Sequence, residues 1–248
     1  MPNYDKLPLF PLHAVLFPRM SLPLHIFEER YRILIERCWE RNEPFGVILL
    51  QQGQEVETAD GKVPAIYAIG TTARIVQSER LDDGRFFIQA QGENRFQVRE
   101  LFSDEPYLTG EVRPLWEQTD DPLQVQPFFD HACHLFRSYL AALLSETHQH
   151  LGSLQLPQDP ALLSYAIAAS LQVTLAEKQK LLEMDSSGER LRREIELLQA
   201  ERETQLFFQL EAQSEARPEG IQNPGSKAVE RTILRVDPSY TQYYFSKN

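Results

Sequence analysis

The sequence predicts an α+β protein in which a β-rich N-terminal part is followed by an all-helical part. Before about residue 117, short apolar runs alternate with polar positions and end at Pro, Gly or Asp-Gly, a pattern typical of strands and turns. After that point, apolar residues recur every three or four positions, which is the spacing of helices that bury one face. With 248 residues, 42% of them hydrophobic, the chain can bury an ordinary core.

The first helix is predicted inside the β-rich part, directly after a proline-rich opening. Four prolines interrupt residues 7–27, which favours short or edge strands because proline cannot donate to a β-ladder. Glu28 and Glu29 then begin a helix that reaches Arg41, in agreement with the preference for negative charge in a first turn. The predicted buried stripe of this helix consists of Tyr31, Leu34, Ile35, Cys38 and Trp39.

Strand-like segments follow this helix. Residues 45–50 form a continuous apolar run, residues 67–77 are rich in Thr, Ile and Val, and Asp83-Gly84 predicts a hairpin into residues 85–91. A separate run after Gly92 and another over residues 108–115 alternate apolar and polar side chains. With the opening strands they predict about six mostly antiparallel strands that curl into a partly closed barrel.

Helix starts in the second part carry capping signals. A capping carboxylate before a proline, or a hydroxyl three residues before a Glu, satisfies backbone N–H groups that have no partner inside the helix. These signals predict four helices, the last over about residues 187–213. They are Asp121-Pro122, Asp159-Pro160, Thr174 with Glu177, and Ser186 with Glu189.

The last predicted helix also shows charge spacing. Glu189 with Arg193, and Arg190 with Glu194, stand four residues apart, so each pair can form an ion pair along the helix surface.

Several motifs resemble the N-terminal, substrate-binding domain of the ATP-dependent protease Lon, the LON domain. The resemblance covers roughly the first 212 residues. It rests on LPLFPLHAVLFPRMSLPLHIFEERYR at 7–32, PFGVIL at 44–49, GTTARI at 70–75, GENRFQV at 92–98 and AASLQVTLAEKQKLLEM at 168–184.

The resemblance implies a PUA-like β pseudo-barrel over residues 1–117 and a helical subdomain over 118–213. Residues 214–248 have no counterpart in it and are predicted to be a linker followed by an aromatic tail. The tail holds Tyr240, Tyr243, Tyr244 and Phe245, which is more apolar surface than is typical of a solvated end. We therefore expect the tail to dock on its own or a neighbouring subunit.

The function implied by the resemblance is binding of substrate or partner polypeptide. The sequence contains no Gly-x4-Gly-Lys-Ser/Thr phosphate loop and no Gly-x-Ser-x-Gly nucleophile elbow. We therefore expect neither ATPase nor peptidase activity and no cofactor. The expected partners are unfolded polypeptides or a partner protease or chaperone.

RNA binding is the alternative function, because PUA-like folds include RNA binders. The formal net charge is −11, and residues 118–213 carry 7 basic against 14 acidic side chains. A phosphate backbone requires clustered Lys and Arg, so this charge balance disfavours nucleic acid.

Histidines offer one possible metal site. His131, Cys133, His134, His148 and His150 lie close in sequence, but Cys133 projects from a different side of the predicted helix than His131 and His134. Zinc needs ligands that converge as a tetrahedron, so solvated or hydrogen-bonded histidines are favoured and no metal is expected.

Candidate polypeptide contacts are exposed apolar residues. Phe17 and Met20 lie in a proline-bounded loop, and Trp116 stands where the barrel gives way to polar residues. Such side chains suit adaptable apolar recognition. By contrast, the apolar residues of the opening motif are explained by core packing, namely Phe10, Leu12, Ile26, Phe27 and Tyr31.

The remaining expectations concern location. No apolar run approaches the roughly 18 residues that span a bilayer, and residues 1–10 lack the features of a signal peptide, so a cytoplasmic location is expected. Cys38 and Cys133 are predicted to be reduced, buried thiols.

Overall fold

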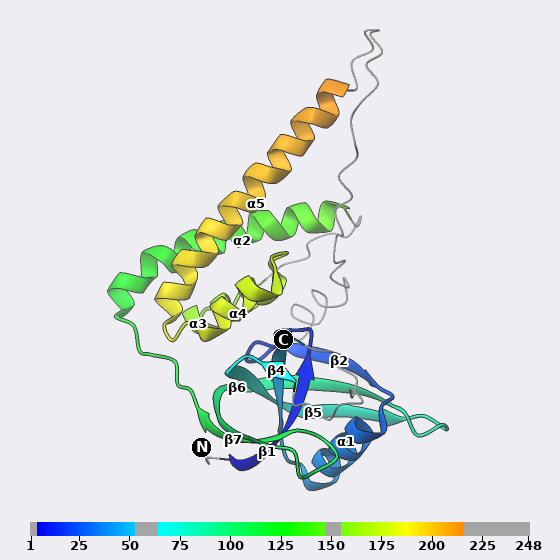
Figure 1. The fold of residues 1–248 in the computed structure, drawn as a ribbon. Helices are drawn as coiled ribbons and strands as arrows, with labels where there is room; N and C mark the ends of the chain where they lie inside the picture. The colour runs from blue at the N-terminus through cyan, green and yellow to red at the C-terminus, as the bar shows by residue number, and fades with distance from the viewer. Residues whose placement is uncertain (1–3, 53–63, 147–154, 216–248) are drawn as a thin grey trace.

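The computed structural model describes residues 4–52, 64–146 and 155–215. The predicted aromatic tail lies outside these residues. Figure 1 shows a β-rich part below a set of helices, which is the α+β arrangement predicted from the sequence. The strands are β1 Tyr4–Leu12, β2 Ser21–Ile26, β3 Phe45–Gln52, β4 Ala65–Ile66, β5 Ile69–Arg80, β6 Phe86–Phe102 and β7 Thr109–Pro114. The helices are α1 Glu29–Arg41, α2 Pro122–Glu146, α3 Pro160–Ser170, α4 Leu175–Glu183 and α5 Ser187–Glu215.

Five of the strands close a ring. The hydrogen-bonded order is β1-β7-β6-β5-β3, and β3 pairs again with β1, in parallel, through Leu9 opposite Gly46 and Leu12 opposite Leu49. The other pairs in this ring are antiparallel, as predicted. Two short strands lie outside the ring, because β2 pairs with the first half of β6 and β4 pairs with β3. The predicted partly closed barrel is therefore a closed ring with two added strands.

Strand alternation divides the apolar residues of β1 between two cores. Leu7 and Leu9 belong to a small core with Ile48, Phe96 and Val112. Phe10 and Leu12 of β1 face the other way, because successive side chains in a strand point to opposite faces. They join a large core that includes the buried face of α1 and residues from all four later helices.

Gly92 does not end a strand, although the sequence suggested separate runs on its two sides. The backbone of β6 continues from Phe86 to Phe102 through this glycine. The glycine is needed for a close approach, because a Cβ atom at position 92 would collide with the carbonyl oxygen of Phe17. One long strand therefore serves both β2 and β7 as a partner.

Helix α1 begins and ends almost where the sequence predicted. It runs from Glu29 to Arg41 and ends at Asn42, which adopts a left-handed conformation with φ of 52°. Tyr31, Leu34, Ile35 and Cys38 are buried, as expected. Trp39 was also expected in this stripe, but it is exposed. At about 100° per residue it lies at the edge of the stripe formed by the other four residues.

The capping signals mark the starts of helices α2 to α5. Asp121 and Asp159 accept hydrogen bonds from the backbone N–H groups of Leu123 and Leu162. Thr174 and Ser186 accept from the N–H groups of Glu177 and Glu189 in the same way. These hydroxyl bonds are the first half of each predicted capping box.

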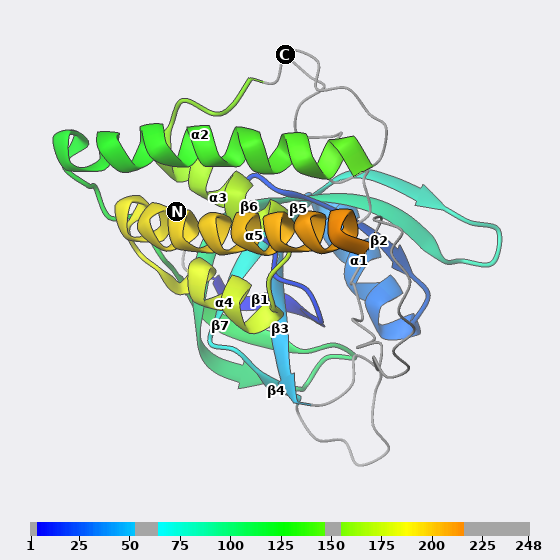
Figure 2. The same cartoon turned by 90° about the horizontal axis from the view of Figure 1, so that it is seen from above.

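The helices and the barrel share one core. Figures 1 and 2 show α3 and α4 between the barrel and the longer helices α2 and α5, which pack along each other. The large core runs without interruption from barrel residues such as Phe45 to helical residues such as Leu191. The boundaries predicted at residues 117 and 213 stay predictions, although the strands end at Pro114 and α2 begins at Pro122.

Both cysteines are free. Burial raises the pKa of the Cys38 thiol to about 12. Cys133 is half-buried rather than buried as expected, and partial burial also raises its pKa. In the described ranges, no helix is both long enough and apolar enough to cross a membrane.

Candidate polypeptide-binding surface

The three residues predicted to contact polypeptide occupy different environments. Phe17 and Met20 are buried, so the expectation that they are exposed is wrong. Trp116 is 61% exposed. The structure therefore does not join these residues into one accessible surface.

The loop that carries Phe17 and Met20 is covered by tertiary contacts. Arg19 donates its backbone N–H to the carbonyl of Gly92, and Gly92 donates to the carbonyl of Met20. The ring of Phe17 lies 6.2 Å from the ring of Tyr165 on α3. The proline-bounded loop is thus packed between the barrel and the helices. Its burial could not be predicted from the sequence, because its partners Gly92 and Tyr165 lie far away in the chain.

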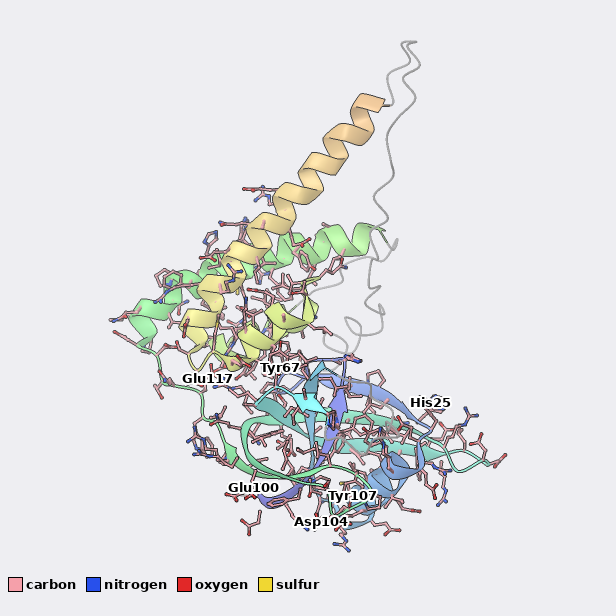
Figure 3. All side chains as sticks on the ribbon, viewed as in Figure 1. His25, Tyr67, Glu100, Asp104, Tyr107 and Glu117 are labelled. Carbon is pink, nitrogen blue, oxygen red and sulfur yellow. The ribbon has the colours of Figure 1, made fainter. Side chains whose placement is uncertain are left out.

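Exposed aromatic side chains gather on the outer face of β2 and β6. Strand pairing sets His25 opposite Phe87, and their rings stack with centroids 4.5 Å apart. The ring of Phe27 lies 6.0 Å from that of His25. Phe27 is 58% exposed and Phe87 is 48% exposed. We call His25, Phe27 and Phe87 the aromatic surface; Figure 3 labels His25 on the side of the barrel where the β5–β6 hairpin projects.

The aromatic surface follows from strand alternation. Phe86 and Phe87 are neighbours in one strand, so their side chains point to opposite faces, and only Phe86 is buried. Ile26 and Phe27 divide in the same way, with Ile26 buried. Phe27 was expected in the core, and that expectation is wrong. Adjacent apolar residues at positions 26–27 and 86–87 are the sequence signal that could have identified this surface.

The β5–β6 hairpin is held next to the aromatic surface by polar contacts. The carboxylate of Asp83 accepts hydrogen bonds from the backbone N–H and the guanidinium of Arg85. The backbone hydrogen bond, followed by the guanidinium, lowers the pKa of Asp83. The same guanidinium lies 3.4 Å from the Nε2 atom of His25. The turn itself contains Gly84 at a φ of +81°, a conformation that favours glycine.

A buried arginine fixes the barrel to the helices. Arg95 projects from β6 and is almost fully buried. Its guanidinium donates to the backbone carbonyls of Leu182, Met184 and Trp116, and it lies 3.2 Å from the carboxylate of Asp185. A guanidinium with several acceptors can remain charged inside a protein. This contact joins the barrel, the connector to α2 and the turn between α4 and α5.

A second buried arginine, Arg190 on α5, completes this junction. It donates to the Ser164 hydroxyl, the Met184 carbonyl and the carboxylate of Glu117, and it lies over the ring of Tyr165. The phenol of Tyr165 donates to the other oxygen of Glu117. Burial is the main cause that raises the pKa of Tyr165 to about 12. This phenol therefore stays a hydrogen-bond donor at neutral pH.

The ion pairs predicted within α5 do not form as expected. Arg190 bonds to other elements, and in the described part of the chain neither carboxylate oxygen of Glu194 has a hydrogen-bond partner. Glu194 is fully buried, and this burial raises its pKa well above the usual value despite the attraction of Arg190. Arg193 pairs with Glu177 of α4 and with Glu196 rather than with Glu189.

Trp116 stands on this rigid junction. Its backbone carbonyl accepts from Arg95, and the next residue, Glu117, is bonded to Arg190 and Tyr165. Gln118 donates its N–H to the carbonyl of Asp185. The indole is therefore exposed on a segment whose backbone is fixed on both sides.

The histidine cluster does not assemble a metal site in the structure's described portion, where no three His, Cys, Asp or Glu side chains could hold an ion. His131 and His134 lie one turn apart on α2. His148 and His150 lie outside the described residues.

Comparison with known proteins identifies the family of this sequence. The family model described as "ATP-dependent protease La (LON) substrate-binding domain" matches residues 6–200. Lon proteases of Dictyoglomus thermophilum and Escherichia coli K12 are each 27% identical to the chain, over 94% of it and 30% of their own length. The chain thus spans about a third of the curated relatives it matches. The matched share also reaches beyond the first 212 residues, further than the motifs indicated.

Solved structures agree with this match. The Lon N-terminal domain protein from Xanthomonas campestris is 28% identical, with a TM-score of 0.56, and the match covers 77% of this chain and 96% of that one. The N-terminal domain of Mycobacterium avium complex Lon protease shares the fold at 18% identity, with a TM-score of 0.57 and coverages of 79% and 98%.

Proposed function

This chain belongs to the family of the ATP-dependent protease La (LON) substrate-binding domain, and we propose on that premise that it binds polypeptide segments without catalysing a reaction on them. Its partners are unfolded polypeptides, or a protease or chaperone to which it presents them. The favourable contribution to binding is burial of apolar side chains of the partner, and only the part that exceeds the entropy lost on association appears as affinity.

One observation supports a location for this binding, namely the aromatic surface. Aromatic side chains offer a large contact area and lose little conformational entropy when they are bound. Phe27 and Phe87 expose about half of their surface, and His25 lies near both, stacked on the ring of Phe87 and tilted to the ring of Phe27. Trp116 is the candidate for a second contact, because its indole is exposed and its backbone is fixed.

The same proposal assigns no catalysis to these 248 residues. The purified chain should hydrolyse neither ATP nor a casein-like protein, because its sequence contains neither phosphate loop nor nucleophile elbow. RNA binding is disfavoured by the net charge of −11. A cytoplasmic location stays a prediction.

The test is binding of a fluorescently labelled, unfolded apolar peptide, measured by anisotropy. The double variant Phe27→Ser/Phe87→Ser should weaken binding by about tenfold or more, since it removes two aromatic contacts of about 1 kcal/mol each. Trp116→Ser, measured alone, tests whether the segment between β7 and α2 contributes to peptide binding. The melting temperature should fall by only a few degrees, because these side chains are at least about half exposed in the folded chain.

Leu123→Ser is the matched control, because Leu123 is also an exposed apolar residue but lies at the start of α2. It should bind the peptide as the unmodified chain does. If no apolar peptide binds to the folded chain, the proposed function is wrong. If peptides bind with the same affinity when Phe27 and Phe87 are replaced, the proposed location of the binding site is wrong. Tight, salt-resistant RNA binding would favour the alternative.

A further inference from the structure

We infer that the aromatic surface selects polypeptide segments in which apolar residues are flanked by Lys or Arg. The inference rests on the proposed function and specifies the class of partner that this surface accepts. It follows from the charges around the three aromatic rings.

Three exposed carboxylates belong to the segments that carry the aromatic surface or adjoin it in the chain. Glu79 stands opposite Phe87 in the β5–β6 pairing, on the same row as His25. Asp82 lies in the hairpin turn, and Glu29 follows Phe27 by two residues at the start of α1. All three side chains are exposed, and none of them has an ion-pair partner among the residues that the structure describes.

The arginines of the same region are already engaged. Arg80 pairs with Glu36 at 3.0 Å, and Arg85 pairs with Asp83 at 2.7 Å. Arg30 pairs in the same way with Glu28 at 2.9 Å.

Arg32, a fourth arginine near the turn, forms no ion pair with the described residues, but it is half-buried beside Gly84 and its Nε atom is buried. The region therefore holds six carboxylates and four guanidiniums, and its exposed unpaired charges are negative. The six are Glu28, Glu29, Glu36, Glu79, Asp82 and Asp83, and the four are Arg30, Arg32, Arg80 and Arg85.

A bound segment would meet both parts of this surface. Apolar side chains can cover the rings of Phe27 and Phe87, while cationic side chains beside them reach Glu79 or Asp82. Lys and Arg are suited to this position because their long aliphatic stems pack on apolar surface while the charged end stays in water. Arg can also lie on an aromatic face. Segments flanked by acidic residues are repelled by the same carboxylates and by the net charge of −11.

The size of the effect is limited by solvent. An exposed ion pair contributes about 0.2 to 1 kcal/mol, which is about 1.4- to 5-fold in affinity. Two such pairs on one side and repulsion on the other give an expected preference of about tenfold for Lys-flanked over Glu-flanked peptides at low salt. At about 0.15 M salt the Debye length is near 8 Å, so the preference should shrink without vanishing.

The experiment compares three peptides that share one apolar core and differ only in flanks of Lys, Gln or Glu. Dissociation constants are measured by anisotropy with the intact chain at two salt concentrations. The expected order of affinity is Lys, then Gln, then Glu. Glu79→Gln/Asp82→Asn should weaken the Lys-flanked peptide by about two- to tenfold and leave the Gln-flanked peptide unchanged. Glu79→Lys should reduce or reverse the order.

The matched control is Glu100→Gln/Glu111→Gln, which changes the net charge by the same amount. Both residues are exposed and lie on β6 and β7, and Figure 3 shows Glu100 away from His25 on the other side of the barrel. This control should keep most of the preference for Lys flanks. A control as effective as Glu79→Gln/Asp82→Asn would mean that only the global charge acts, and the inference would be overturned.

The outcomes separate the inference from the function on which it rests. If all three peptides bind equally and depend on Phe27 and Phe87, the proposed function holds and the selectivity is wrong. If none binds, the function itself fails. A preference for Glu flanks would also reject the inference, and it would indicate that Arg85 or Arg32 is freed on binding.

Discussion

At the scale of single residues, Glu194 is the side chain whose ionisation is most affected by the fold. It is fully buried, and burial raises its pKa well above the usual 4.5, against the smaller opposing effect of Arg190. A carboxyl group whose pKa is higher in the folded state binds more protons there than in the unfolded chain. Its contribution to stability is therefore complete below about pH 4.5 and is lost as the pH rises towards the raised pKa.

We predict that Glu194→Gln removes this loss. Gln has nearly the same shape and stays neutral, so the variant should gain stability relative to the unmodified chain as the pH rises above about 4.5. The slope of the difference is at most about 1.4 kcal/mol per pH unit for one proton. Urea unfolding at several pH values measures it.

The control for this prediction is Glu196→Gln, two residues further along α5, where the carboxylate is exposed and paired with Arg193. Because this side chain is exposed, the substitution should change the free energy of unfolding by no more than about 0.5 kcal/mol. The contribution of Asp120 to stability depends on pH in the opposite direction to that of Glu194. Although its partial burial would raise the pKa, hydrogen bonds from Ser186, Gly188 and Ser187 lower it, so its stabilisation is lost as the pH falls. Equal pH slopes for Glu194→Gln and the unmodified chain would contradict the raised pKa of Glu194.

A second prediction at this scale concerns Arg95. Arg95→Met keeps the buried volume but removes a cation from three carbonyl groups and from Asp185. We expect a loss of about 3 to 5 kcal/mol in the free energy of unfolding, because three backbone carbonyl groups lose their donor at the junction, each at a cost of about 1 to 3 kcal/mol if it stays without a partner. Urea unfolding at neutral pH measures this loss.

Arg95→Lys should recover only part of it, since an ammonium group cannot reproduce the planar fork. As a surface control, Arg113→Met removes an exposed guanidinium that donates to Gln97 and should change stability by no more than about 0.5 kcal/mol. A similarly small effect of Arg95→Met would show that the junction contributes little to stability.

At the scale of secondary-structure elements, the start of α5 depends on a residue outside the helix. The carboxylate of Asp120 accepts from the hydroxyls of Ser186 and Ser187 and from the backbone N–H of Gly188. It therefore caps α5 from the segment that precedes α2, and a single side chain links that segment to a helix start that is distant in sequence.

We predict that Asp120→Ala destabilises the chain by about 2 kcal/mol or slightly more, because a helix cap is lost and two hydroxyls lose an acceptor. Asp121→Ala, at the next position, removes a conventional cap from Leu123 on α2 and should cost about 1 kcal/mol. Chemical unfolding of both variants tests the difference. If the two substitutions cost the same, the link between Asp120 and α5 is not energetically significant.

At the scale of the whole molecule, the barrel and the helices depend on one another. Phe17 packs against Tyr165, Arg95 bonds to the turn before α5, and the amide of Gln179 donates to the carbonyl of Ile69. The large core includes residues of both parts. Separation would expose this apolar contact and leave Arg95 without most of its acceptors.

We therefore predict that residues 1–117 alone are less stable than the barrel in the intact chain, and that residues 1–213 unfold in a single transition. Calorimetry and proteolysis of the two fragments provide the measurement. The short fragment should bind an apolar dye at the uncovered Phe17 face and melt at a lower temperature. Two separate transitions in residues 1–213 would mean that the predicted boundary at 117 divides independent domains.

The sequence by itself determined the helix starts and the hairpin. Asp83-Gly84 predicted the turn between β5 and β6, and the Asp-Pro, Thr and Ser signals predicted the helix starts that the structure shows. These features are local, because a turn or a cap involves residues that are at most a few positions apart. The strand limits were less accessible, because Pro8, Pro11, Pro23 and Gly92 lie inside strands rather than at their ends. The family could also be identified from the sequence, because its motifs are continuous segments of the chain.

Only the tertiary structure decided which of these residues are exposed. Phe17 and Met20 were expected at the surface and are buried, whereas Phe27 was expected in the core and is exposed beside Phe87. The predicted pair of Arg190 and Glu194 became two separate buried groups, because Glu117, Ser164 and Met184 approach from other elements. Burial and the partners of a charge depend on segments that lie far apart in the chain, and no local pattern encodes how those segments are brought together.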